Sequence, residues 1–384
     1  MKTTKGADVK IIPKCKLVLL SISLIYSSYC AAADLDPEYY ISKWRMKPTQ
    51  TTIVSKGTAS QKNLYNPKPN EVASLPIIRD AEKIIEGKPI LAFLMIDENN
   101  NIIFESYKNG AHNDDLIIGH SMTKSISSII IGQYLCEGLI GSLNDRAEKY
   151  SSSLRGTAYG DATIKELLMM ASRGSLGIAE GGNPEQDFRN RIVRQQTLSL
   201  RDAFVEFGQN HKNPAPKGVF SYKGLDTAAL SILLADIKHT KYQNVISQNL
   251  WTKIGAEKNA EIIVDKNHDA LAEGGLGATA RDWARLGIFV RDNIKNNTCL
   301  GNYLKEATAG QIKVPAERPT QFLMYGYQFW TDNKLIETKS AWFLGVGGQQ
   351  IGVDLLSGKI IVRLSYSEKG VWDTYKIFNI WTQM

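Results

Sequence analysis

Short apolar runs bounded by turn residues gather in two parts of the chain, one near residue 100 and the other after residue 325. The early runs, 89–96 and 102–107, are separated by Asp-Glu-Asn-Asn-Asn, which predicts a β-hairpin. The later runs predict further strands at 327–332, 341–344, 350–354 and 359–365. We therefore expect an antiparallel sheet built from both parts of the chain.

Helical patterns occupy most of the remaining sequence. The predicted helices span 36–46, 70–85, 121–138, 164–171, 200–207, 226–237, 245–254, 281–293 and 372–382. Residues 47–72 form an irregular polar connection, and strand signals become sparse between residues 140 and 265.

These patterns predict an α+β fold, in which an antiparallel sheet is flanked by helices and carries a mostly helical inserted domain. The sheet domain combines residues 75–150 with 266–384, and the helical domain spans 151–265. An N-terminal helix and extension, 34–74, precede them. Active sites commonly form at such domain junctions.

The first 33 residues have the layout of a secretory signal peptide. Lysines come first, an apolar core follows at 17–26, and three alanines end the segment at 31–33. The apolar core is too short to span a membrane comfortably. Tyr29 is bulky where a lipoprotein signal has a small residue before its cysteine, here Cys30. We therefore expect cleavage and a periplasmic or secreted protein without a stable membrane span, with a signal anchor and a lipid anchor less favoured.

Charge and composition exclude several classes of function. The chain carries a net charge of +7, but residues 1–33 hold five lysines and one acid, so that cleavage leaves +3. The remaining Lys and Arg residues are scattered, and no nucleic-acid partner is expected. The five histidines are dispersed, and the sequence has no His-Glu-x-x-His or Cys-x-x-Cys motif. We expect neither a metal site nor a cofactor.

Signal cleavage leaves two cysteines, Cys136 and Cys299. Two cysteines do not make a disulfide framework. Two independent thiols are the favoured interpretation, and a single bridge between them stays open.

The most specific chemical signal is Ser121-Met-Thr-Lys124, at the head of an apolar run. Positions i and i+3 share one face of a helix. A serine hydroxyl needs a neighbouring base, which a neutral lysine amine can be, and a helix start offers backbone N–H groups to an oxyanion. The other interpretation is a capping serine followed by a surface lysine. The chain contains a single Ser-x-x-Lys, placed between a Gly-His turn and an apolar helix, which favours catalysis.

Two further elements follow along the chain. Tyr222, in Phe-Ser-Tyr-Lys-Gly before a predicted helix, can present its phenol to the serine, and Lys223 can stabilise a phenolate. The alternative is a tyrosine packed under the helix start. The glycines of Leu-Gly-Val-Gly-Gly-Gln-Gln, at 344–350, permit close approach of a ligand to the backbone. The alternative there is a tight hairpin.

The order of these elements resembles the serine β-lactamase-like hydrolases, in the branch of class C β-lactamases, esterases and 6-aminohexanoate-dimer hydrolases. The resemblance covers roughly residues 75–382 and implies a β-lactamase/transpeptidase-like fold. Other stretches that resemble segments of this family are 140–150, 163–172, 274–287 and 325–330.

The family resemblance also implies roles for individual residues. Ser121 would be the acylated nucleophile, Lys124 would accept or relay its proton, and Tyr222 would be the general base and acid for the leaving group. The backbone N–H groups of Ser121 and Val346 would form the oxyanion hole.

The chain departs from the family at both later elements. Gly345 and Gly347 are expected to bind substrate, but Phe343 stands where penicillin-recognising members carry the cation of Lys-Thr-Gly or His-Thr-Gly. Gly224 replaces the Asn or Ser that usually follows the tyrosine by two residues. Without a cation at position 343, an efficient β-lactamase or D,D-peptidase is disfavoured, and a neutral ester or amide substrate is favoured.

We therefore predict a serine hydrolase, an esterase or amidase, that cleaves a small ester or amide through an acyl-enzyme on Ser121. A penicillin-binding protein or β-lactamase is the first alternative. The alternative of another class is a catalytically silent protein that binds a peptide or a cell-wall fragment, which the presence of Ser121, Lys124 and Tyr222 together disfavours. The expected partner is a small-molecule substrate, and the sequence leaves the oligomeric state open.

Overall fold

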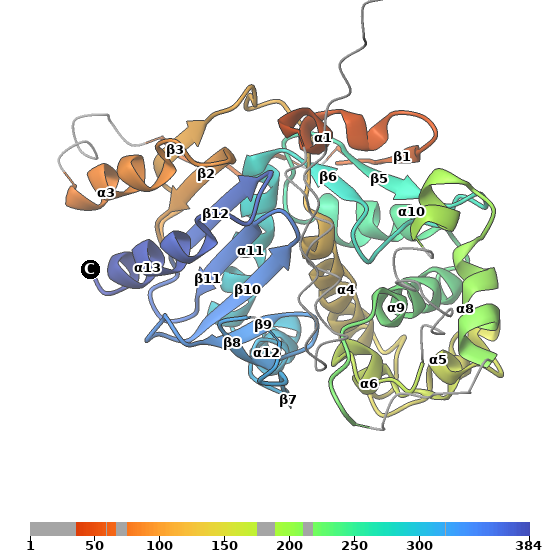
Figure 1. The fold of residues 1–384 in the computed structure, drawn as a ribbon. Helices are drawn as coiled ribbons and strands as arrows, with labels where there is room; N and C mark the ends of the chain where they lie inside the picture. The colour runs from red at the N-terminus through yellow and green to blue at the C-terminus, as the bar shows by residue number, and fades with distance from the viewer. Residues whose placement is uncertain (1–35, 59, 67–74, 175–188, 210–217, 319) are drawn as a thin grey trace, which may run out of the picture. The chain divides into compact units, whose positions relative to one another are not determined.

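Two antiparallel sheets organise the chain (Figure 1). The computed structural model describes residues 36–58, 60–66, 75–174, 189–209, 218–318 and 320–384, which belong to one compact unit. The larger sheet has the strand order β3-β2-β12-β11-β10-β9-β8-β7. Its strands are β2 (Ile90–Ile96), β3 (Ile102–Tyr107), β7 (Ile312–Lys313), β8 (Phe322–Tyr325), β9 (Trp330–Asn333), β10 (Ser340–Gly345), β11 (Gln349–Asp354) and β12 (Ile360–Ser365).

The early hairpin joins the late strands where β2 pairs with β12. The two strands are antiparallel, with Ile360 opposite Ile96 and Leu364 opposite Ala92. β2, β11 and β12 are buried along their whole length, as expected for strands covered on both faces. The structure therefore confirms the predicted α+β fold and the sheet built from both parts of the chain.

Helices cover both faces of the larger sheet. α11 (Ala280–Lys295) packs on β2, β11 and β12, and α12 (Cys299–Ala307) packs on α11. α3 (Pro76–Ile85) and α13 (Val371–Thr382) pack together on the opposite face (Figure 1). Side chains alternate between the two faces: Phe343 of β10 belongs to the core under α11, whereas Trp342 belongs to the core under α13.

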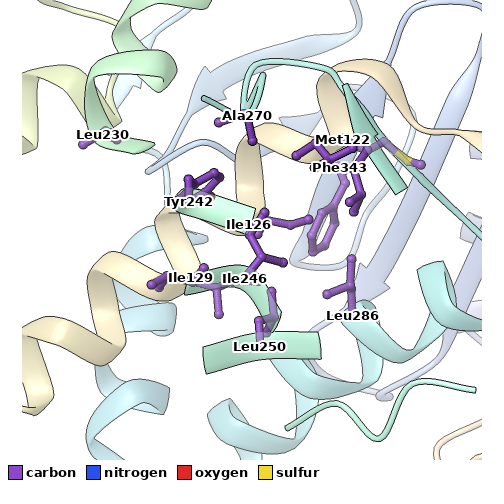
Figure 2. Packing of buried hydrophobic residues seen from close by; sticks show 14 of the residues in the cluster. Met122, Ile126, Ile129, Leu230, Tyr242, Ile246, Leu250, Ala270, Leu286 and Phe343 are labelled. Atoms are coloured by element: carbon purple, nitrogen blue, oxygen red, sulfur yellow. The ribbon is translucent and has the colours of Figure 1, made fainter. Parts of the chain in front are cut away.

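The helix that follows the serine motif is deeply buried. α4 (Lys124–Cys136) packs against α9 (Gly224–Ile237) and α12, and its residues are buried on nearly every side. Figure 2 shows Ile126 and Ile129 of α4 near Tyr242 and Ile246 of α10. The other helices are α1 (Pro37–Ile41), α5 (Ala158–Asp161), α6 (Ile164–Leu168), α8 (Leu200–Gln209) and α10 (Tyr242–Ile246), with π-helical turns at Asn190–Arg194 and Ser247–Trp251.

The smaller sheet was not predicted. It has the order β1-β5-β6-β4, with β1 at Gln50–Val54, β4 at Ile117–Ile118, β5 at Ala260–Val264 and β6 at Leu276–Ala278. The prediction of an irregular connection at 47–72 is therefore wrong for β1. β5 lies in the domain predicted as mostly helical, 151–265, after its last predicted helix. Both strands are short, and they form because Gln50 to Val54 pair with Val264 to Ala260, far along the sequence. The domain boundaries at 151 and 265 stay a prediction.

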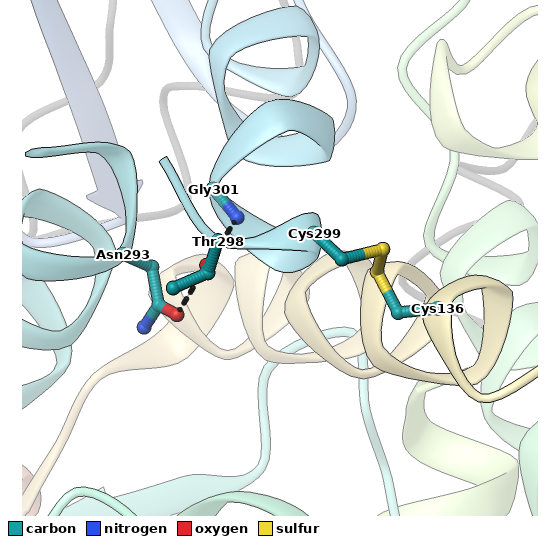
Figure 3. The surroundings of a disulfide bond; sticks show 5 residues. All are labelled: Cys136, Asn293, Thr298, Cys299 and Gly301. Atoms are coloured by element: carbon teal, nitrogen blue, oxygen red, sulfur yellow. Dashed lines mark hydrogen bonds between the residues drawn. A yellow bond between two sulfur atoms is a disulfide. The ribbon is translucent and has the colours of Figure 1, made fainter. Parts of the chain in front are cut away.

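Cys136 and Cys299 form a disulfide, with 5.9 Å between their Cα atoms (Figure 3). The favoured expectation of two independent thiols is therefore wrong. The two cysteines are 163 residues apart. They meet because α12 begins at Cys299, directly after its cap Thr298, beside the end of α4.

No helix within the described ranges is long and apolar enough to cross a membrane. The predicted signal segment, 1–33, lies outside those ranges.

Candidate active site

The serine motif begins in a tight turn that connects the small sheet to α4. β4 leads through Gly119 into a 3₁₀ helix, His120–Thr123, and the α-helix begins only at Lys124. A Cβ on Gly119 would lie 2.3 Å from the Trp283 ring, so this position requires glycine. Ser121 thus lies in the 3₁₀ turn, and the α-helix begins three residues after the predicted start at 121.

Lys124 and Ser121 lie side by side, as their spacing predicts. The Lys124 side chain is buried, and its Nζ donates a hydrogen bond to Ser121 Oγ over 3.1 Å. The same Nζ also donates to the backbone carbonyl of Glu273. These two acceptors hold the amine against the hydroxyl, where a neutral amine could remove the hydroxyl proton.

Tyr222 lies next to this pair. Lys124 Nζ is 5.3 Å from the centroid of the Tyr222 ring. The ring also packs against Trp330, at 5.5 Å between centroids, and against Tyr325, at 6.2 Å. Ser121, Lys124 and Tyr222 therefore come from two distant segments of the chain to one place.

The cation expected beside Tyr222 is a different lysine from the one predicted. Lys223 Nζ donates to Ser172 O over 2.8 Å and lies 3.7 Å from the buried Asp226 carboxylate. The burial of Asp226 raises its pKa, although Lys223 and Ser172 oppose that effect. Lys223 therefore braces the start of α9, and the basic side chains near the Tyr222 ring are Lys124, at 5.3 Å from its centroid, and Arg318, at 4.9 Å.

The glycine-rich turn between β10 and β11, residues 346–348, is called here the site turn. It follows Gly345, whose added Cβ would lie 2.2 Å from Gly119 O, so the end of β10 touches the serine turn. In the described part of the chain, no hydrogen bond uses the N–H of Val346 or that of Ser121. Both groups therefore have no protein acceptor there, and their role as an oxyanion hole stays a prediction.

The other two N–H groups of the site turn are already used. Gly347 N and Gly348 N donate to Glu368 Oε1 over 2.9 Å and 3.2 Å. A Cβ on Gly347 would lie 2.2 Å from Tyr40 Oη, so the side of the turn is covered as well. These contacts do not support the prediction that Gly347 binds substrate. Gly345 lies beside the serine turn, where its contact with substrate stays a prediction.

A buried arginine braces the site turn, and the sequence analysis missed it. Arg363 of β12 is fully buried and donates to Gly348 O over 2.6 Å, to Ser367 O over 3.3 Å and to Lys369 O over 2.9 Å. Burial lowers the pKa of Arg363 to about 10. The single charge inside the apolar run Ile-Ile-Val-Arg-Leu was the available signal.

His120, directly before the serine, is held between aromatic rings. Its ring lies 6.2 Å from that of Tyr39, stacked, and 5.3 Å from that of Tyr40, edge-on. Its Nε2 is buried, and burial lowers the pKa of His120 to about 3, an effect to which the nearby cations add. The imidazole is therefore neutral at neutral pH, and its packing fixes the turn that carries Ser121.

The structure explains the departures from the family pattern. Phe343 is buried against Phe329, with 5.0 Å between ring centroids, so its side chain belongs to the core. Gly224 begins α9.

Comparisons with known proteins agree on one family. The sequence model of the family described as Beta-lactamase matches residues 91–376. The 6-aminohexanoate-dimer hydrolase of Paenarthrobacter ureafaciens is 25% identical over 299 residues, which are 74% of this chain and 75% of that protein.

Solved structures share the fold. The Bacillus anthracis structure titled "Putative 6-aminohexanoate-dimer hydrolase" has a TM-score of 0.65 and 21% sequence identity, over 89% of this chain and 91% of that chain. The D-stereospecific amidohydrolase of a Streptomyces species has a TM-score of 0.59 and 15% identity, over 78% and 98%. Both are similar enough to show the fold, which matches the expected β-lactamase/transpeptidase-like architecture.

Proposed function

Because the chain belongs to the Beta-lactamase family, we propose that it is a serine hydrolase that cleaves a small ester or amide through an acyl-enzyme on Ser121. The observation that carries the proposal is the 3.1 Å hydrogen bond between Lys124 Nζ and Ser121 Oγ, with the Tyr222 ring 5.3 Å from the same nitrogen. The hydrolase names of the relatives support it, and the name amidohydrolase supports an amide in particular.

In the proposed reaction, Lys124 accepts the Ser121 proton while Oγ bonds to the carbonyl carbon of the substrate. The carbonyl oxygen gains the negative charge and accepts hydrogen bonds from the N–H groups of Ser121 and Val346. Tyr222 donates a proton to the leaving group as its bond to carbon breaks, which leaves the acyl-serine. Tyr222 then takes a proton from water, the hydroxide attacks the acyl carbon, and Ser121 departs with the proton held by Lys124.

Penicillins are disfavoured as substrates. A penicillin carboxylate is held by a cation in the third motif of penicillin-recognising members, and the matching Phe343 is buried in the core. We expect no detectable acylation by benzylpenicillin, measured by the mass of the intact protein. A stable adduct on Ser121 would instead favour the penicillin-binding alternative.

The first test is hydrolysis of p-nitrophenyl acetate and butyrate by the protein without residues 1–33, beside Ser121→Ala. We expect turnover in the parent and its loss in the variant, by roughly 10³-fold or more. Equal rates in both folded proteins would contradict the proposed nucleophile. No turnover in either would move the assignment towards a narrow amidase or a binding protein.

A second test separates Tyr222 from its aromatic neighbours. Tyr222→Phe keeps the ring but removes the hydroxyl, and we expect kcat to fall about 10²- to 10⁴-fold. Tyr325→Phe is the matched control, because it removes a hydroxyl from a ring 6.2 Å away in the same cluster. Equal losses in kcat would show that packing, and not the Tyr222 hydroxyl, limits the rate.

We also propose that the protein is exported and acts in the periplasm or outside the cell. The signal-like segment 1–33 and the Cys136–Cys299 disulfide support this location, because disulfides persist in oxidising compartments. Cell fractionation of the full chain and the mass of its mature N-terminus test the proposal. A protein retained in the cytoplasm with its first 33 residues intact would contradict it.

A further inference from the structure

Helix α1 lies against the serine turn, residues 119–123, through two tyrosines. The Tyr40 ring meets the His120 ring edge-on, with 5.3 Å between their centroids, and the Tyr39 ring stacks on the His120 ring at 6.2 Å. Tyr40 is fully buried, although it belongs to a helix of only five residues. The serine turn therefore packs against a segment from far earlier in the chain. No motif in the sequence singles out Tyr40.

Tyr40 also contacts the site turn. A Cβ added to Gly347 would lie 2.2 Å from Tyr40 Oη, 2.6 Å from its Cζ and 2.7 Å from its Cε1, so the ring packs directly against the backbone of that turn. Gly347 has a φ of 80°, a conformation that residues with a Cβ rarely adopt. Glycine thus permits both the turn and the close approach of the ring. One side chain therefore contacts the serine turn and the site turn.

The two residues that Tyr40 contacts flank the proposed oxyanion donors. His120 directly precedes Ser121, so the N–H of Ser121 belongs to the peptide plane that joins these two residues. Gly347 directly follows Val346, whose N–H is the second donor. Because peptide planes are rigid, a rotation of His120 or a displacement of Gly347 moves the N–H group beside it. The spacing and direction of the two donors therefore depend on how Tyr40 packs.

His120 needs such support because its backbone is strained. Its φ is 45°, in the left-handed region, which residues other than glycine occupy uncommonly. A strained residue of this kind persists only where the surrounding contacts hold it. Without the Tyr40 ring, His120 can relax towards negative φ, which rotates the peptide that bears the Ser121 N–H.

Helix α1 is itself anchored on the small sheet. Trp44, in the 3₁₀ turn Lys43–Arg45 that follows α1, donates from Nε1 to Leu116 O over 3.3 Å. A Cβ on Gly277 of β6 would lie 2.2 Å from the Trp44 ring, so the indole packs directly on that strand. From this fixed position Tyr40 reaches the turn at the end of the larger sheet.

We propose that Tyr40 is a positioning residue, which sets the distance and direction of the Ser121 and Val346 N–H groups towards an oxyanion. Tyr40 takes no part in proton transfer and acts through His120 and Gly347. The inference rests on the proposed function, in which both N–H groups stabilise the negative charge that develops on the carbonyl oxygen. A misdirected donor raises the barriers to acylation and deacylation more than it weakens binding of the neutral substrate.

The kinetic test is the hydrolysis of p-nitrophenyl acetate by Tyr40→Leu. We expect kcat to fall by roughly 10- to 100-fold, with KM changed by less than about threefold, because only the transition state carries the oxyanion. Tyr40→Phe keeps the ring carbons that face both turns, so its kcat should stay within about threefold of the parental value. Tyr40→Met, whose flexible side chain fills irregular gaps, replaces Tyr40→Leu if that variant does not fold.

Tyr39→Leu is the matched control, because it removes the other ring packed on His120 and leaves the Tyr40 contact with Gly347 in place. We expect a kcat loss of no more than about threefold, while the melting temperatures of both leucine variants fall. Equal kcat losses in the two leucine variants would overturn the inference, since general loosening of the serine turn would then explain the rate. A parental kcat in Tyr40→Leu would overturn it as well, and so would a loss in Tyr40→Phe as large as that in Tyr40→Leu.

An inhibitor that builds an oxyanion on the enzyme reports on the donors directly. 1,1,1-Trifluoro-2-butanone forms a hemiketal when a serine Oγ bonds to its carbonyl carbon, and the carbonyl oxygen becomes the oxyanion. We expect its inhibition constant to rise in Tyr40→Leu by about the factor by which kcat/KM falls. An unchanged inhibition constant beside a lowered kcat/KM would contradict a role of Tyr40 in the oxyanion hole.

Crystal structures separate this inference from the proposed function, because they need no turnover. In Tyr40→Leu we expect the distance between the Ser121 and Val346 nitrogens to change by about 0.5 Å or more, and in Tyr39→Leu by less. If Ser121→Ala leaves hydrolysis intact, the proposed nucleophile fails, while the nitrogen positions still test Tyr40. If Ser121 is essential but Tyr40→Leu keeps the parental nitrogen positions and kcat, the positioning role alone fails.

Discussion

The two turns at opposite ends of β11 are built alike. The site turn precedes the strand, and the turn at 355–359, called here the far turn, follows it. Gly348 and Gly358 stand at positive φ in them, 81° and 78°, where other residues are strained. A buried arginine holds each turn by a glycine carbonyl: Arg363 donates to Gly348 O over 2.6 Å, and Arg291 donates to Gly358 O over 3.1 Å.

The two turns differ in whether a backbone N–H group is left without an acceptor. Every N–H from 355 to 359 donates to an acceptor, namely Lys339 O, Asp354 Oδ1 twice, Asp354 O and Ser357 Oγ. In the site turn Gly347 and Gly348 donate to Glu368, and Val346 N–H alone has no acceptor in the described part of the chain. The donor without a protein acceptor thus lies at the end of β11 beside the serine turn, which is the end at which chemistry is expected.

Removing the Val346 N–H should give the largest difference in kcat between the two turns. Val346→Pro deletes the N–H, and we expect kcat on p-nitrophenyl acetate to fall by about 10²- to 10³-fold, the usual cost of losing one oxyanion donor. Leu356→Pro is the matched change in the far turn, where the N–H bonds Asp354 Oδ1 over 3.1 Å. It should lower the free energy of unfolding by about 1–3 kcal/mol and leave kcat unchanged.

Equal effects of these two variants on kcat would contradict the distinction between the two turns. Equal kcat losses would mean that proline acts through the strand as a whole. A folded Val346→Pro protein with parental kcat would remove Val346 from the oxyanion hole. Thermal melts of both proteins establish that each is folded before the rates are compared.

Substitution of the two turn arginines should give a smaller difference in kcat between the turns. Arg363→Met removes three hydrogen bonds from the segment around the site turn, and we expect a kcat loss of about 10-fold with KM changed less. Arg291→Met removes a similarly buried arginine from the far turn and should lower the melting temperature without changing kcat. A kcat loss that tracks melting temperature in both variants would assign Arg363 a structural role only.

Substitution of the acids that accept hydrogen bonds from the turn N–H groups should give the smallest difference in kcat between the two turns. Glu368→Gln keeps an oxygen for Gly347 and Gly348 but removes the charge that strengthens both bonds, so we expect kcat to fall by about two- to fivefold. Asp354→Asn makes the same change in the far turn and should leave kcat as it is. An unchanged kcat in Glu368→Gln would show that the charge is unimportant.

The sequence predicted the elements whose pattern is visible within a short stretch of the chain. The hairpin β2–β3, the strands β10 to β12 and the adjacency of Ser121 and Lys124 follow from period, turn residues and helical spacing, and the structure has them. The predicted strand 327–332 is correct only from Trp330, where β9 begins. The position of Tyr222 beside Lys124 needed the family resemblance, because no local pattern joins residues about 100 apart in sequence.

What the sequence did not predict depends on distant partners. Arg363 is one charge in an apolar run, and only the fold shows that it ends at Gly348 O. The strands β1 and β5 lie far apart in the sequence and form by pairing with each other. Lys223 looked like the partner of Tyr222 because the two are neighbours, but successive residues point apart, and Lys223 turns to Ser172.

Removal of the disulfide is a control that should change the stability of the protein without changing the structure of either turn. It ties the end of α4 to the start of α12, and Cys136 lies 12 residues along α4 from Lys124, or about 18 Å at the rise of an α-helix. Reduction, or Cys136→Ser with Cys299→Ser, should lower the free energy of unfolding by about 2–5 kcal/mol, since the bridge closes a long loop of the unfolded chain. Denaturant melts with and without reductant measure this change.

At temperatures where the reduced protein stays folded, kcat should equal that of the oxidised protein, because the contacts of Lys124 with Ser121 and Glu273 lie at the other end of the helix. A loss of kcat on reduction, without unfolding, would mean that α4 transmits a displacement from its last turn to its first. Site geometry would then depend on the α4–α12 contact as well as on the two ends of β11. An unchanged kcat with reduced stability would confine the determinants of rate to the serine turn, the site turn and Tyr222.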